Sequence, residues 1–100
     1  MEERIRKLIE QRKKLNMNDD KGIQNCWEEI TDILSDNEVN TITYLDNCSK
    51  DDVYWISEVF EDISQNLQWH KFIECLRRLD LKFPELDMTK DIDLAADYII

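Results

Sequence analysis

Apolar residues recur along this chain at the three- and four-residue spacing of amphipathic α-helices. The most regular series is Ile23, Cys26, Trp27, Ile30, Ile33 and Leu34. Six such apolar stripes follow one another, spanning residues 5–15, 23–34, 39–48, 53–67, 72–83 and 88–99. The pattern predicts an all-α fold of about six short antiparallel helices, arranged as a helical bundle or as a short α-solenoid-like stack of hairpins.

Polar residues between the stripes predict where helices begin and end. Side chains able to accept backbone N–H bonds stand at the expected starts, namely Asp19 or Asp20, Asn37, Ser49, and Asp87 or Thr89. Pro84 is expected to stop the fifth helix, because its ring clashes with the preceding turn. The third stripe, from Val39 to Cys48, is spaced by three throughout and therefore drifts around its helix.

An offset of 30 residues lays the second stripe over the fourth, so that Ile23 and Ile30 align with Val53 and Phe60. This weak internal similarity favours stacked hairpins. The chain of 100 residues contains one glycine and one proline, which is typical of helices joined by short turns. A single helical domain over residues 1–100 is expected at this length.

The net charge of −10 changes the functional expectations. A nucleic-acid ligand is disfavoured because its binder must replace counterions with Lys and Arg, and an anionic membrane is disfavoured for a similar reason. Attraction to a basic protein partner is favoured. The alternative is that the acidity serves only solubility.

The acidity is concentrated in the middle of the chain. Residues 1–14 carry six basic and three acidic residues (net +3), whereas residues 22–69 carry eleven acidic residues and only Lys50 (net −10). On a helical wheel, Glu28, Asp32 and Asp36 point away from the apolar stripe of the second helix. The fourth helix points four polar residues outward, Tyr54, Glu58, Glu61 and Gln65, with Trp55, Val59 and Asp62 at the boundary.

Carboxylates repeated at this spacing without basic neighbours repel one another, so stability alone does not favour the pattern. An outward tyrosine beside them is typical of an interface anchor. We therefore predict a partner-binding surface made of Glu28, Asp32, Tyr54, Trp55, Glu58, Glu61 and Asp62. The competing interpretation is a solvated face that happens to be acidic.

Catalytic and metal-binding constellations are not recognisable in the sequence. His70 is the only imidazole. Phosphate-cradling loops need several glycines, and Gly22 is the only glycine in the chain. Three cysteines, Cys26, Cys48 and Cys75, form no metal-binding pair and fall on or beside apolar stripes. The chain is expected not to be an enzyme and to need no cofactor or metal. The charged N-terminus and the absence of a long apolar run predict a cytoplasmic location.

Residues 50–99 carry a family resemblance. The stretch "DDVYWISEVFEDISQNLQ" and the later "FIECLRRLDLKFPELDMTKDIDLAADYI" resemble small immunity proteins of bacterial polymorphic toxin systems. More narrowly, they are similar to the helical immunity proteins of contact-dependent growth inhibition. The similarity rests on W-[IL]-S-E-V-F-E and on F-I-E-C-L followed by [KR]-[FY]-P-E-L, with a looser helical match upstream.

The resemblance implies a cytoplasmic protein that binds one cognate toxin domain and blocks it. Many such toxins are nucleases, including EndoU-like and other RNases, and a nuclease holds its polyanion in a basic groove that an acidic surface can occupy. No site residue is carried over from the family. The alternative function is an acidic helical adaptor, an antitoxin or a nucleic-acid mimic outside such a system.

Overall fold

The computed structural model describes residues 1–100, and every regular element in it is helical. The α-helices are α1 (Glu2–Lys14), α2 (Asp20–Leu34), α3 (Glu38–Asp46), α4 (Lys50–Ile56), α5 (Phe60–Leu67), α6 (His70–Lys82) and α7 (Thr89–Asp97). Two short 3₁₀ helices complete the set, η1 (Ser57–Val59) and η2 (Pro84–Leu86). The all-α prediction is confirmed. The segment predicted as one fourth helix consists of α4, η1 and α5 in direct succession.

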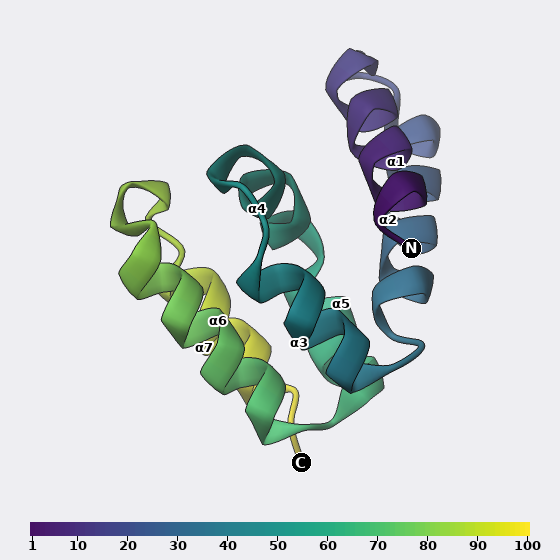
Figure 1. The fold of residues 1–100 in the computed structure, drawn as a ribbon. Coiled ribbons are helices and arrows are strands. Elements are labelled where there is room, and N and C mark those ends of the chain that lie inside the picture. Colours follow the sequence, from purple (N-terminus) through teal and green to yellow (C-terminus); the bar gives the residue numbers. More distant parts are fainter.

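The helices are stacked as hairpin-like pairs (Figure 1). α1 packs against α2, and α6 packs against α7. Between these pairs, the middle segment places α3 beside α6, α4 beside α1, and α5 between α2 and α7. The radius of gyration is 12.7 Å, close to the value of about 13 Å expected for a folded chain of this length. The chain therefore forms a compact all-α fold of short packed helices.

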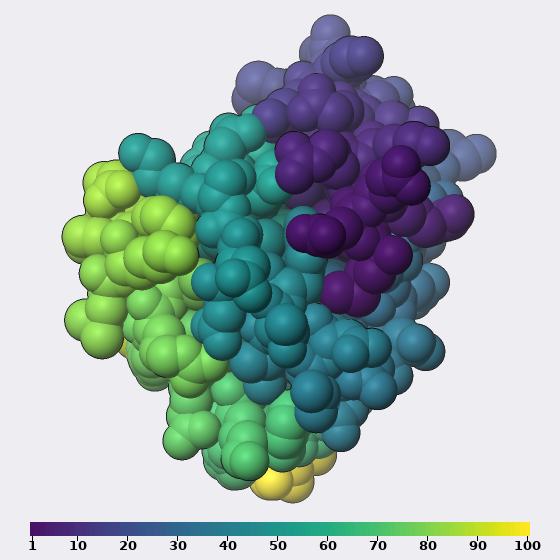
Figure 2. Space-filling model, viewed as in Figure 1, coloured from purple at the N-terminus to yellow at the C-terminus, as the bar shows by residue number.

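One continuous apolar core receives side chains from all seven α-helices. Its largest side chains without solvent exposure include Phe60 of α5 and Phe72 of α6. Helix α1 contributes Ile5 and Ile9, and α7 contributes Ile92. The space between ribbons in Figure 1 is filled by side chains, and in Figure 2 the purple, teal and green segments meet across the visible face.

The 3₁₀ turn at η1 changes which side chains face the core. A 3₁₀ helix has about three residues per turn, so it rotates successive side chains further than an α-helix does. Val59, expected at the boundary of a regular wheel, is only 1% exposed. The short turn thus buries Ile56, Val59 and Phe60 together.

Three of the predicted N-caps form and one does not. Asp19, Asn37 and Ser49 each accept a hydrogen bond from the backbone N–H three residues later. The prediction that Asp87 or Thr89 caps the last helix is wrong. Met88 occupies that position without a side-chain bond, and the Thr89 hydroxyl donates to Asp80 instead. Asp87 has a left-handed backbone (φ 52°) at the end of η2.

The spacing of the third stripe left the core face of its helix undecided, and in the structure Val39 is 60% exposed. A stripe that drifts around the helix cannot keep all its members in the core. In α3, Thr41 and Leu45 are the buried residues. The Thr41 hydroxyl donates to the Leu34 carbonyl at 2.6 Å, so a residue read as polar connects α3 to the end of α2.

The C-terminal residues are held by the turn between α5 and α6. Gln68 ends α5 with a left-handed backbone (φ 49°). Its side-chain amide donates to the Tyr98 carbonyl at 2.7 Å, and its Oε1 accepts from the Ile100 N–H at 2.9 Å. A buried bond from the Ser64 hydroxyl to the Ala95 carbonyl adds to this attachment. These contacts fix α7 against α5, which positions one edge of the site described next.

Candidate functional site

Three carboxylates predicted for the partner-binding surface meet in one depression between α2 and α5. We call this depression the α2–α5 hollow, and its volume is about 220 Å³. Its lining residues are Gln24, Trp27, Glu28, Thr31, Asp32, Asp62, Gln65 and Asn66. Glu28 and Asp32 come from successive turns of α2, and Asp62 reaches the same depression from α5. No basic side chain lines it.

A second depression lies where η1 and α5 approach α7. This α5–α7 hollow has a volume of about 260 Å³ and is lined by Tyr54, Ser57, Glu58, Glu61 and Asp91. This hollow brings together three of the sequence-predicted residues, Tyr54, Glu58 and Glu61. Helix α7 adds Asp91, the third carboxylate of the hollow. The two hollows adjoin, because Glu58 of the second is hydrogen-bonded to Trp27 of the first.

Glu58 does not present a free carboxylate, contrary to its expected outward position without a balancing cation. Arg12 of α1 binds it through two bonds, from Nε at 2.9 Å and from Nη2 at 2.8 Å. The Trp27 indole N–H donates to the same carboxylate at 3.1 Å. These contacts leave the Glu58 side chain with only 26% of its accessible surface. Glu58 therefore has a structural connection that its sequence neighbours do not reveal.

The two aromatic residues of the predicted surface differ in exposure. Tyr54 is 51% exposed, and its ring meets that of Trp55 edge-on with 5.2 Å between the ring centroids. Trp55 is partly buried against the core, and the Arg12 guanidinium lies 5.1 Å from its ring centroid. Tyr54 remains available to a partner, whereas Trp55 mainly supports Arg12.

Basic residues of α1 neutralise the beginning of the middle segment. Besides the Arg12–Glu58 pair, Lys13 pairs with Asp51, and Arg6 lies 3.9 Å from the largely buried Asp52. The positive charge of residues 1–14 is thus directed at the acidic residues of α4 and η1. Arg4 also pairs with Glu29 of α2, but no cation of α1 pairs with the other carboxylates that line the two hollows.

Apart from Glu58, the carboxylates that line the two hollows form no ion pair. We call this group the acidic face, and it consists of Glu28, Asp32, Glu61, Asp62 and Asp91. None of them takes part in any of the chain's salt bridges. Within the acidic face, the one side-chain hydrogen bond joins Gln24 to Glu28 at 3.2 Å. A surface of this kind can attract and hold basic groups, at a rate that falls with salt.

Several residues of the site were not identified from the sequence. Asp91 is in a different helix from the other acidic residues, and it borders the apolar stripe of Ile92 and Ala95, so a helical wheel of α7 does not mark it as an outward carboxylate. Thr31 was missed because a threonine next to an apolar stripe carries no functional signal. Arg12 was missed because a helical wheel describes one helix and contains no information on its neighbours.

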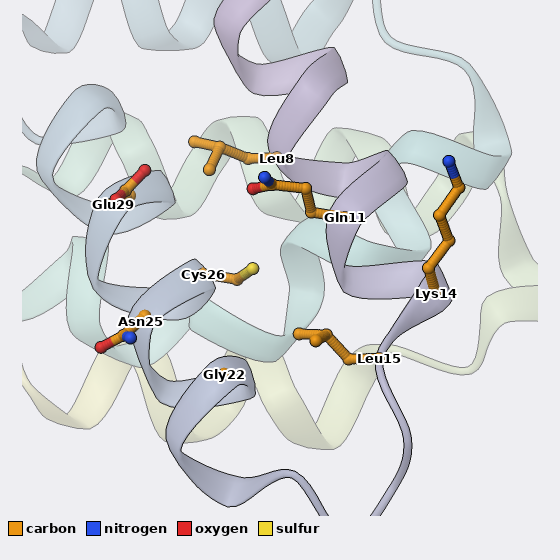
Figure 3. Close-up of a pocket in the computed structure, with 8 residues that line it drawn as sticks. All are labelled: Leu8, Gln11, Lys14, Leu15, Gly22, Asn25, Cys26 and Glu29. Carbon is orange, nitrogen blue, oxygen red and sulfur yellow. The ribbon is translucent and has the colours of Figure 1, made fainter.

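A larger depression lies between α1 and α2 (Figure 3), with a volume of about 380 Å³. Leu8, Leu15 and Cys26 form its apolar part, and the Cys26 sulfur points into the space between the two helices. Lys14 and Glu29 lie at its polar margin. Since both signs of charge are present, this depression lacks the electrostatic character of the acidic face.

The three cysteines are free thiols in buried positions. Burial raises the pKa of Cys48 to about 11 and that of Cys75 to about 12, and it also raises the pKa of Cys26. The reactive form of cysteine is the thiolate. These thiols are therefore protonated at neutral pH and behave as small apolar core residues, as their place on the apolar stripes predicts.

The raised thiol pKa values predict that the folded state loses stability in alkaline solution. The folded protein keeps these protons while the unfolded chain releases them above the ordinary pKa of 9.0. This stabilisation is complete below that pH and is lost as the pH rises toward the folded values. The free energy of unfolding should fall by roughly 1.4 kcal/mol per pH unit for each thiol between about pH 9 and 11. Urea titrations at a series of pH values measure the slope.

Matched variants separate the thiols from other titrating groups. Cys48→Ala with Cys75→Ala should flatten the slope, whatever it does to stability at neutral pH. Cys26→Ala, which removes a thiol whose pKa is raised less, should change the slope little. An unchanged slope in the double variant would contradict the assignment.

No helix is both long and apolar enough to cross a membrane. No group of three or more His, Cys, Asp or Glu side chains has an arrangement suited to a metal ion. Comparison of the chain with models of protein families, with curated proteins and with solved structures finds no match. The function is therefore argued from the acidic face and from the resemblance of residues 50–99.

Proposed function

We propose that this chain is an immunity protein that binds one cognate toxin domain and neutralises it by covering the toxin's basic surface. The favoured toxin is a nuclease, most readily an RNase, and the protein acts in the cytoplasm of the cell that makes the toxin. It does so by binding alone, without catalysis and without a cofactor. The observation that carries the proposal is the acidic face, whose five carboxylates have no ion-pair partner.

The way the chain distributes its cations supports a binding role for that face. Where carboxylates of α4 and η1 meet α1, Arg6, Arg12 and Lys13 neutralise them. The five carboxylates of the acidic face have no such neutralisation, although they lie close enough to share two adjoining hollows. Unneutralised like charges disfavour the folded state slightly, so a basic partner offers the compensation that the chain itself lacks.

A nuclease is a suitable basic partner for the acidic face. It must concentrate positive charge to hold a phosphate backbone, and a docked acidic surface competes for the same field. Tyr54 at the margin of the α5–α7 hollow supplies an exposed aromatic side chain of the kind that anchors protein interfaces. Inhibition then follows from steric and electrostatic occlusion.

The test is to mix the protein with the C-terminal domain of the toxin encoded by the neighbouring gene. A complex that isolates as one species and lacks toxin activity is the expected result. No complex, or a complex with undiminished toxin activity, would refute the proposal.

Charge reversal locates the interface. Asp32→Lys with Asp62→Lys should lower the association rate constant by about ten-fold or more at low salt. The matched control is Glu3→Lys with Glu74→Lys, which changes the net charge equally at exposed positions outside the acidic face. Surface plasmon resonance at several salt concentrations measures both. Equal losses in the two double variants would place the interface elsewhere.

Gene neighbourhood separates this proposal from its main alternative. An immunity gene lies immediately after the gene of a large secreted toxin, whereas an acidic adaptor, an antitoxin or a nucleic-acid mimic has no such neighbour. The acidic face would serve any of these roles, so the toxin gene carries the distinction.

A further inference from the structure

The α2–α5 hollow contains a buried polar atom without a partner. Thr31 is 8% exposed, and its Oγ1 is the one buried side-chain polar atom in the chain that forms no hydrogen bond. Thr31 lines the hollow together with Glu28, Asp32 and Asp62. A buried hydroxyl left unpaired costs about 1–3 kcal/mol by its lost hydration. Because Thr31 is part of the wall of this polar depression, a ligand bound there is the candidate partner for the hydroxyl.

The chemistry of the lining defines the ligand. Three carboxylates favour a cationic ligand, and the lining residues add further acceptors in the Thr31 hydroxyl and the side-chain carbonyls of Gln24, Gln65 and Asn66. Trp27 contributes an indole ring at the edge of the same depression. The volume of the hollow, about 220 Å³, is below the roughly 300–1,000 Å³ of sites for drug-sized molecules. A space of this size suits a single side chain.

We infer that the α2–α5 hollow receives one arginine side chain of the protein partner. Guanidinium carries five N–H donors in a planar fork and stacks on aromatic rings, which matches several acceptors beside an indole. A lysine ammonium has three donors around one point and would leave more of these acceptors unused. The inference rests on the proposed function for the identity of the partner, but the hollow's preference for guanidinium can be measured without it.

Trp27 links this site to the rest of the molecule. Its indole N–H is already donated to Glu58, so its ring is held in place at the edge of the hollow. The Glu58 carboxylate is in turn held by Arg12. The hollow is thus formed in the unbound protein, which lowers the ordering cost of binding.

The experiment uses N-acetyl-arginine methylamide as probe, with the lysine and citrulline analogues as comparisons, and follows the ¹⁵N spectrum of the full chain. Saturable shifts at the Trp27 indole, Thr31 and the Asn66 side-chain amide are expected, with a dissociation constant on the order of 1–10 mM. The lysine analogue should bind several-fold more weakly. The uncharged citrulline analogue should cause no saturable shift. Equal responses to arginine and citrulline, or none to arginine, would overturn the inference.

Two variants test the named atoms. Asp62→Asn should weaken arginine binding by about five- to ten-fold, a loss typical of one charge-assisted hydrogen bond. Asp36→Asn, two residues beyond the end of α2 and outside the hollow, should leave binding unchanged. Thr31→Val removes the unpaired hydroxyl while keeping its shape, so it should weaken arginine binding without lowering the melting temperature. Unaltered binding in both Asp62→Asn and Thr31→Val would reject the site.

The outcome is separable from that of the proposed function. Arginine binding by a chain that forms no toxin complex would refute the immunity role and leave the guanidinium site standing. Toxin inhibition by a chain that ignores the arginine probe would refute the guanidinium site alone.

Discussion

Replacement of Phe60 by alanine is expected to lower the free energy of unfolding by about 3–5 kcal/mol. Phe60 begins α5, immediately after the 3₁₀ turn, and none of its surface is exposed. Its removal leaves a cavity where α5 meets its neighbours, and a small domain has only about 5–15 kcal/mol of stability in total. Urea unfolding followed by circular dichroism measures the change.

Tyr54→Ala is the matched control for this substitution. Tyr54 lies six residues earlier in the same continuous helical segment, and half of its surface is exposed. Its loss should cost less than about 1 kcal/mol, because it removes little buried area and one edge-on contact with Trp55. Comparable losses for the two variants would show that the packing around Phe60 is not as described.

Arg12→Ala is expected to lower the free energy of unfolding by about 2–3 kcal/mol. The side chains of Arg12 and Glu58 are 17% and 26% exposed, so water screens their two hydrogen bonds incompletely. The substitution leaves the Glu58 carboxylate with only the Trp27 indole as a side-chain donor. It also removes the guanidinium that lies over Trp55. Chemical denaturation of the single variant gives the loss directly.

A double-mutant cycle isolates the pairwise energy. Arg12→Ala, Glu58→Ala and their combination should give a coupling energy of roughly 1.5 kcal/mol or more. The pair Arg4 and Glu29, whose side chains are 67% and 51% exposed, provides the control and should couple by less than about 1 kcal/mol. A coupling at Arg12–Glu58 no larger than that of the control pair would contradict a structural role.

This role of Glu58 bears on any test of the binding surface. A lysine at position 58 would repel Arg12 instead of pairing with it, and this repulsion would displace α1. A loss of partner binding in such a variant would therefore not show that residue 58 contacts the partner. Asp32 and Asp62 take part in no ion pair or side-chain hydrogen bond, so their reversal breaks no such contact within the fold. The interface is therefore better tested at these two positions.

Much of the fold could be predicted from local rules. The 3.6-residue period identified the helices, and the caps at Asp19, Asn37 and Ser49 followed from side chains that satisfy the first free N–H groups. The same rules left the core face of the third stripe undecided, and Val39 on that stripe is exposed. The predicted cap of the last helix was wrong, because the start of α7 uses no side-chain cap at all.

The candidate site divides in the same way. The sequence by itself determined that acidic residues lie on the outer sides of α2 and of the α4–α5 segment, because that follows from periodicity within each helix. Only the tertiary structure decided which of these carboxylates are neutralised. Arg12 and Glu58 are 46 residues apart, and no local pattern connects them. Packing also brought Asp91 beside Glu61 and placed Thr31 beside Asp62, because contacts between helices depend on how the whole stack buries its apolar stripes.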